Sequence, residues 1–185
     1  MRDKNEICQI ESTLEEDRPW IDFELPENSS QNWELVDDIF RDRATVEGPL
    51  PVEVRVNHPE ALEWDYYSIP GTSGAFSHRA WLLLSPVART HFSFYELRLN
   101  KVEYYLFKPT IPLHCLDLGT SELVYYSHDP SRIREVKKFR FKADSFPNPV
   151  VFWIPECWSK ILCTASVRDL VMRECLRGLK FVGVE

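Results

Sequence analysis

Prolines occur throughout this chain and limit the length of its regular elements. The 185 residues include thirteen prolines, from Pro19 to Pro155, but only six glycines. Proline lacks a backbone N–H and is poorly tolerated inside helices and central strands. This spacing favours short strands and irregular connections over a helical bundle. Because 44% of the residues are hydrophobic and 13% aromatic, the chain is expected to fold around a core.

Short strands are the most frequent pattern. Period-two alternation and brief apolar runs are typical of strands. They predict strands at 52–56, 79–84, 95–99, 102–107, 160–164 and 180–184. Asn100 and Lys101 are expected to form a tight turn between two of these strands. A strand, a glycine turn and a second strand are expected within 114–126, and a strand with a basic outer face within 134–143.

Three segments predict helices. Apolar residues recur at helical spacing in 32–44 and, more clearly, in 165–176. Ser85 followed by Pro86 is typical of a helix start, and Gly178 is expected to end the last helix. The buried face of that helix is expected to contain Val167, Leu170, Val171 and Cys175.

These elements predict an α+β fold, mostly antiparallel β-sheet with a few short helices, in a single compact domain. We expect residues 1–45 to be an acidic, partly irregular N-terminal segment with one short helix. Residues 46–185 are expected to form the main domain.

The charge is unevenly distributed. Residues 1–65 contain 18 acidic and 6 basic side chains, a net charge of −12, whereas residues 66–185 contain 11 acidic and 16 basic, a net charge of +5. The acidic front half would repel phosphates and would suit a basic protein partner. Solubility alone is the other explanation of this charge.

The cysteines predict a reducing compartment. There are five of them, and none forms a CxxC pair. The charged opening MRDKNEICQIESTLEED lacks the apolar stretch of a secretory signal, and no apolar run reaches the length of a membrane span. We therefore expect a cytoplasmic protein with free thiols and no membrane association.

The stretch HCLDLGTSELVY, residues 114–125, contains the side chains of nucleophilic catalysis and metal binding. Adjacent residues of a strand point to opposite faces, so His114 and Cys115 cannot form a dyad there. A hydrolase could still use Cys115 or Ser121 with a distant histidine such as His78 or His91. The alternative is that the stretch builds a strand and a turn, and we expect no catalytic residue.

No cofactor or metal site is expected either. Cysteine and histidine do not occur at the spacing of zinc ligands. The glycine patterns that bind nucleotide phosphates are missing from the sequence.

A basic stripe accompanies aromatic residues in the second half of the chain. It comprises Arg132, Arg134, Lys137, Lys138, Arg140 and Lys142, beside Tyr125, Tyr126 and Phe139. Such a stripe in 132–142 could bind nucleic acid. We favour a solvated strand face and expect no nucleic-acid partner.

The order of motifs in the C-terminal part resembles an immunity-protein family of bacterial polymorphic toxin systems, immunity family eleven. The resemblance covers about residues 79–185 well and 45–78 loosely. Its motifs are the tyrosine pair 104–105, Leu116–Asp117 with Ser121, Phe139–Arg140, and Thr164 before a short helix. A closing Gly178–Leu179–Lys180–Phe181 strand completes them.

The resemblance implies an antitoxin role rather than an enzyme. Such a protein binds a cognate toxin, secreted by contact-dependent or type VI-like machinery and encoded upstream, and occludes its active site. A basic toxin, such as a nuclease, would suit the acidic front half. We therefore expect the toxin-binding residues to include Trp33, Asp37, Asp38, Asp42, Glu60, Glu63, Trp64 and Asp65. The sequence leaves monomer and homodimer open.

Overall fold

The fold is taken from a computed structural model that describes residues 6–12, 53–54, 64–67, 74–99, 102–142, 147–158 and 160–184. These residues form three mostly antiparallel sheets and two α-helices, with turns and loops between them. The expected α+β class is therefore confirmed. The helix predicted at 32–44 lies outside the described residues, and the strand predicted at 52–56 is described only at 53–54.

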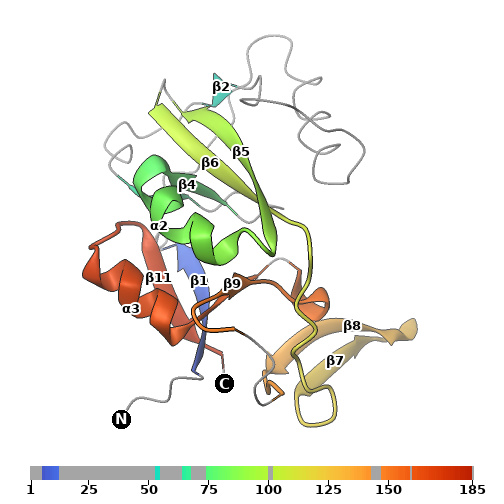
Figure 1. Cartoon of the computed structure of the whole chain (residues 1–185). Helices are drawn as coiled ribbons and strands as arrows, with labels where there is room; N and C mark the ends of the chain where they lie inside the picture. Colours follow the sequence, from blue (N-terminus) through green and yellow to red (C-terminus); the bar gives the residue numbers. More distant parts are fainter. Residues whose placement is uncertain are drawn as a thin grey trace.

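A four-stranded antiparallel sheet is covered on both faces (Figure 1). Its strand order is β11-β1-β10-β9, with β11 at Leu179–Gly183, β1 at Ile7–Ser12, β10 at Ile161–Thr164 and β9 at Val151–Phe152. Cys8 and Cys163 belong to one hydrophobic cluster, whereas their neighbours Ile7 and Leu162 belong to another. Successive side chains of a strand point to opposite faces, so one face of this sheet packs in the first cluster and the other face in the second. The first 45 residues contribute a strand to the same sheet as the C-terminal residues.

A five-stranded sheet lies against the first cluster. Its order is β2-β5-β6-β4-β3, with β2 at Glu53–Val54, β5 at Phe92–Leu99, β6 at Val102–Pro109, β4 at Ala75–Ser77 and β3 at Tyr66–Tyr67. Only β2 pairs in parallel. The long β5–β6 pairing confirms the two strands expected at 95–99 and 102–107. Their connection at 100–101 is outside the described residues.

Helix α2, His78–Ala88, replaces the expected strand at 79–84 and the expected helix start at Ser85. The prediction was wrong because an unbroken apolar run does not distinguish strand from helix. Ala80, Leu84 and Ala88 recur every four residues and are buried, and the segment 78–84 has no β-branched residue. The true N-cap is Ser77, whose Oγ accepts from the Ala80 N–H at 3.1 Å.

Helix α3, Ala165–Arg173, confirms the helix predicted in the C-terminal part, but it ends earlier than expected. Val167 and Val171 are buried as predicted. Cys175 was expected on the same face, but it lies beyond the helix, exposed and at a φ of 52°. Gly178 does not end the helix; it lies in the turn that leads into β11.

The third sheet is a two-stranded hairpin of β7, Glu122–Tyr126, and β8, Asp129–Lys138. It projects from the body beside the 3₁₀ turn η2, Pro155–Cys157 (Figure 1). β8 begins five residues before the strand expected at 134–143 and ends at Lys138. Of the strand expected at 114–118, only Leu116 pairs, in an isolated bridge with Phe141.

Asp65 joins elements from three parts of the chain. Its carboxylate accepts hydrogen bonds from the Ser77 hydroxyl at 2.6 Å and from the Arg177 N–H at 2.8 Å. Its own N–H donates to the Arg177 carbonyl at 2.9 Å, and its carbonyl accepts from the Ser77 N–H at 2.9 Å. Gly178 completes the junction, because at its φ of +86° a Cβ would lie 2.7 Å from the Tyr66 carbonyl oxygen.

Replacing Asp65 should destabilise the protein strongly. Asp65→Ala leaves the Ser77 hydroxyl and the Arg177 N–H without acceptors, so we expect a loss of about 3 kcal/mol in the free energy of unfolding. Urea unfolding measures it. The exposed Glu135→Ala is the matched control, with an expected change within about 0.5 kcal/mol. Equal stability of the two variants would contradict the role of Asp65 as a junction.

Candidate functional site

Asp117 organises a turn in the stretch 114–121. Its carboxylate accepts from the Gly119 N–H at 3.0 Å and from the Thr120 hydroxyl at 2.8 Å. Its carbonyl accepts from the Ser121 N–H at 3.0 Å. The hydrogen bond from Thr120, followed by that from Gly119, lowers the pKa of Asp117. The carboxylate is thus held ionised in a structural turn.

Ser121 fastens this turn to the end of the hairpin. Its Oγ accepts from the Arg140 N–H at 3.0 Å and donates to the Arg140 carbonyl at 3.2 Å. That carbonyl also accepts from the Asp117 N–H at 2.7 Å, and the Lys142 N–H donates to the Cys115 carbonyl at 2.8 Å. We call residues 115–121 and 139–142 together the clasp. It anchors both ends of the hairpin at one place on the body.

The hairpin has one apolar face. Leu123 lies opposite Val136, and Tyr125 lies opposite Ile133. Val136 is buried in the second cluster, and Leu123 and Ile133 pack against it. Tyr125, one step further out, is 46% exposed. The apolar face therefore begins in the core at the base of the hairpin and continues into solvent toward the tip.

The opposite face is polar and mixed in charge. Glu122 pairs with Lys138, Val124 with Glu135 and Tyr126 with Asp129. The register shifts three times along the hairpin, as β-bulges or irregularities. Bulges twist a hairpin and redirect its side chains. Here they lie between the clasp and the tip.

The tip is organised by contacts within the hairpin. Asp129 accepts from the Ser131 N–H at 3.1 Å and from its hydroxyl at 2.6 Å, and the hydroxyl contributes most to lowering the pKa of Asp129. The Arg132 guanidinium carbon lies 5.7 Å from the centre of the Tyr126 ring. The ring of Tyr126 is 5.3 Å from that of His128. These contacts order exposed side chains before any partner binds.

The basic stripe predicted at 132–142 is divided between two environments. Arg132, Arg134, Lys137 and Lys138 are exposed on β8. Phe139, by contrast, is buried, and the backbone of Arg140 is bound in the clasp. A single continuous basic strand face does not form, because β8 ends where the clasp begins.

The residues considered for nucleophilic catalysis do not come together. Cys115 is fully buried, and burial raises its pKa to about 12. The Ser121 hydroxyl is occupied by the Arg140 backbone. His91 is buried and donates to the Ile111 carbonyl at 2.8 Å, while His78 lies 3.0 Å from Glu103. Among the described residues, neither histidine is hydrogen-bonded to Cys115 or Ser121.

Two of the expected toxin-binding residues can be placed. Asp65 is only 6% exposed, and both its carboxylate oxygens are engaged in the junction. The Trp64 ring stacks 6.4 Å from Tyr67, and its carbonyl accepts from the Tyr104 hydroxyl at 2.9 Å. These contacts favour structural roles for both. The other six, Trp33, Asp37, Asp38, Asp42, Glu60 and Glu63, lie outside the described residues.

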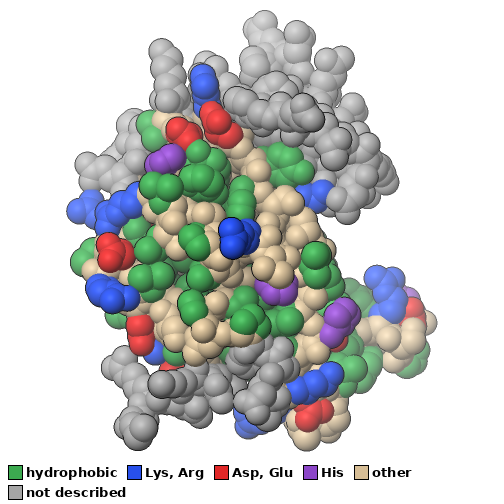
Figure 2. All heavy atoms as spheres, in the orientation of Figure 1, with side chains coloured by type: hydrophobic (Ala, Val, Ile, Leu, Met, Phe, Trp, Pro, Cys, Tyr) green, Lys and Arg blue, Asp and Glu red, His purple; other side chains and the backbone are tan. Residues whose placement is uncertain are grey.

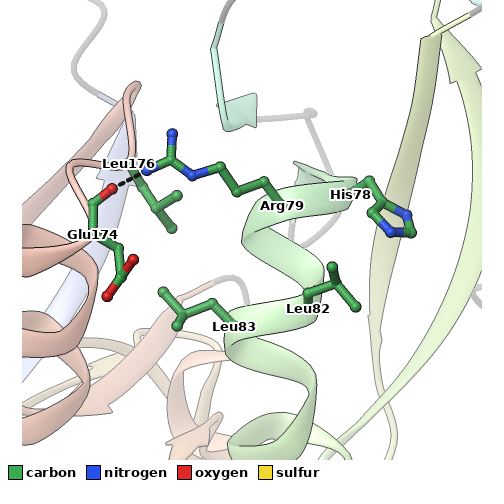
Figure 3. A pocket seen from close by; sticks show the side chains of 6 residues that line it. All are labelled: His78, Arg79, Leu82, Leu83, Glu174 and Leu176. Carbon is green, nitrogen blue, oxygen red and sulfur yellow. Dashed lines mark hydrogen bonds between the residues drawn. The ribbon is translucent and has the colours of Figure 1, made fainter.

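A groove of about 560 Å³ lies between α2 and the end of α3 (Figure 3). Leu82, Leu83 and Leu176 form its apolar part. Arg79 reaches across it and donates to the Glu174 carbonyl, and His78 is engaged with Glu103. Two of its three polar side chains are therefore already engaged.

A second groove, of about 730 Å³, separates the base of the hairpin from the edge of the four-stranded sheet. Charged side chains of both signs line it, including Glu11, Glu122, Glu135, Lys137, Lys138 and Lys160. Beside it, the Phe139 N–H donates to the Val184 carbonyl at 3.3 Å. The hairpin is thus attached through its base and stands clear of the sheet edge.

Metal-binding clusters and membrane-spanning helices are both missing from the part of the chain that the structure describes. In this part of the chain, no group of three or more histidine, cysteine or acidic side chains is placed to hold a metal ion. None of its helices is long and apolar enough to cross a membrane. Comparison with known proteins finds no matching family model and no matching curated protein.

Removing the Ser121 hydroxyl should loosen the clasp. Ser121→Ala deletes both bonds to the Arg140 backbone, so we expect a loss of about 1–2 kcal/mol in the free energy of unfolding. Hydrogen exchange at 139–142 should also accelerate. Thr120→Ala, which removes one exposed bond to Asp117, should cost less than about 0.5 kcal/mol. Unchanged stability and exchange in Ser121→Ala would contradict the role of Ser121 in the clasp.

Thiol reactivity should follow burial. With a pKa of about 12, only roughly one Cys115 thiol in ten thousand is ionised at pH 8. We expect an alkylating probe to label the exposed Cys175 first and to leave Cys115 unlabelled in the native protein. Cys175→Ser should remove the fast phase, as peptide mapping can establish. Rapid labelling of Cys115 alone would instead favour the hydrolase hypothesis.

Proposed function

We propose that this chain is an immunity protein that binds a secreted bacterial toxin and neutralises it by covering its active site. The proposal combines the resemblance over residues 79–185 with the roles of the residues that carry it. Leu116, Asp117 and Ser121 come from one motif, and Phe139 and Arg140 from another. All five belong to the clasp. These five residues thus have structural roles in this chain, which agrees with a protein that binds rather than catalyses.

The hairpin is the observation that most supports binding. An isolated two-stranded hairpin is at best marginally stable, so its base must be held by the body. The clasp and the Leu123–Val136 pair provide that support. Beyond Ile133 the side chains add little to the core, and Tyr125 remains 46% exposed. A projecting, pre-ordered arm of this kind is suited to contact another protein.

The acidic front half remains the second element of the proposal. A net charge of −12 over residues 1–65 would speed association with a basic toxin such as a nuclease. Trp33, Asp37, Asp38, Asp42, Glu60 and Glu63 stay predicted contacts, as does the half-buried Trp64, whereas the carboxylate of the buried Asp65 is held in the junction. On this proposal the protein acts in the cytoplasm of the producing cell.

A nucleic-acid-binding module is the alternative with a specific observation in its favour. Arg132, Arg134, Lys137 and Lys138 are exposed on one strand, and Arg132 lies over an aromatic ring. Binding of this kind would be strongly salt-dependent. The burial of Cys115 and the engagement of Ser121 give the hydrolase alternative less support.

Co-expression tests the proposed function. The chain would be produced in a bacterial host with the C-terminal domain of the protein encoded immediately upstream. We expect host survival and a complex that co-purifies. The matched control is a chain carrying Asp65→Ala, which should protect poorly because its fold is weakened. Death of the host despite well-expressed, folded protein would reject this pairing.

A further inference from the structure

The outer part of the hairpin carries side chains that lie outside both hydrophobic clusters of the described residues. We call Tyr125, Tyr126, His128, Arg132 and Arg134 the tip patch. Among the described residues, its ring and charge contacts stay within the hairpin: Arg132 with Tyr126, Tyr126 with His128, and Arg134 with Glu135 at 4.0 Å. In the same orientation as Figure 1, Figure 2 shows basic, acidic, histidine and apolar side chains together on the projecting arm.

The composition of the tip patch matches that of interface centres. Tyrosine and arginine are enriched among the residues that contribute most to protein binding. Tyr125 is large and 46% exposed, and it sits opposite Ile133 on the apolar face. Arg132 is held in place over Tyr126, so less conformational freedom is lost when it binds. Tyr125 thus offers an apolar anchor on one face of the tip, whereas Arg132 lies with Tyr126 on the other, so the tip patch extends around the end of the hairpin.

The exposed cations of the hairpin indicate what a partner would place opposite them. The hairpin itself, residues 122–138, contains four basic and three acidic side chains, a net charge of +1, within a protein whose total is −7. Its cations, Arg132 and Arg134 toward the tip and Lys137 and Lys138 nearer the base, are exposed on β8. Charge complementarity favours acidic groups opposite these side chains on a partner.

The same residues favour protein over nucleic acid. Glu122, Asp129 and Glu135 lie among the cations, so they would repel a phosphate backbone, which is negative along its whole length. A protein surface can instead place single acidic groups against the arginines alone. The exposed end of the apolar face needs an apolar cover, which a protein recess provides. We propose that the hairpin tip enters a recess on the toxin, with Tyr125 against an apolar wall and Arg132 and Arg134 against acidic groups. This inference rests on the proposed function and names the docking surface.

Site-specific photo-crosslinking tests the placement. A benzophenone-bearing phenylalanine is placed at position 125 or at position 172, where Met172 is 64% exposed on α3. The probe is the purified toxin domain encoded upstream. We expect a cross-linked complex from position 125 and none from position 172. Cross-linking from position 172 alone would place the toxin elsewhere.

Charge neutralisation tests the chemistry. Arg132→Gln with Arg134→Gln should weaken toxin binding at least about tenfold and reduce its salt dependence. Arg89→Gln with Arg173→Gln removes the same charge from exposed positions on other elements and should change binding less than about twofold. Equal urea midpoints would show that both double variants fold. Tyr125→Ala should weaken binding by a similar factor without a change in salt dependence.

The outcomes distinguish a wrong docking surface from a wrong immunity function. Protection and complex formation that survive in the Arg132/Arg134 and Tyr125 variants would overturn the docking surface and leave the immunity function intact. Loss of protection in both hairpin variants, with retention in the Arg89/Arg173 control, supports the inference. If no complex forms with the toxin, but a 20-nucleotide single strand binds and the Arg132/Arg134 variant loses it, both proposals fall in favour of nucleic-acid binding.

Discussion

The carboxylate of Asp65 is the interaction on which the rest of the structure depends. It is nearly buried, and it joins the start of α2, through Ser77, to the turn between α3 and β11, through Arg177. This side chain therefore links the two larger sheets, which also share the first hydrophobic cluster. A buried charge is costly unless it is fully hydrogen-bonded. Here both oxygens are engaged, and Gly178 allows the backbones to approach closely enough.

The opposite end of the molecule uses the same principle with a neutral side chain. Ser121 satisfies both the N–H and the carbonyl of Arg140, and Asp117 holds the turn that presents Ser121. Between the Asp65 junction and the clasp, the two faces of the four-stranded sheet pack in two separate hydrophobic clusters. Within the described ranges, the hairpin is fixed at its base. Attachment at the base thus both anchors the hairpin and leaves its tip exposed.

Sequence patterns predicted the elements that local periodicity determines. The strand at 102–107 and the helix from residue 165 follow from alternation and helical spacing. The segment 79–84 was assigned wrongly, because its leucines are compatible with both states until a neighbour covers one face. Asp65 was assigned to an interface, because an acidic residue in an acidic region gives no local sign of burial. Its partners Ser77 and Arg177 are 12 and 112 residues away.

The hairpin shows why the candidate site was harder to predict than the fold. Its aromatic and basic residues can be found in the sequence. Which face of the hairpin each lies on, however, depends on three register shifts, and a regular two-residue alternation does not predict these shifts. A regular strand through 132–142 would have produced a continuous basic face. The shifts and the clasp instead bury Phe139 and leave Arg132 over Tyr126. Local departures from regular pairing are expected where a surface serves binding rather than folding. On the proposed function, this irregular hairpin is the part that contacts the toxin.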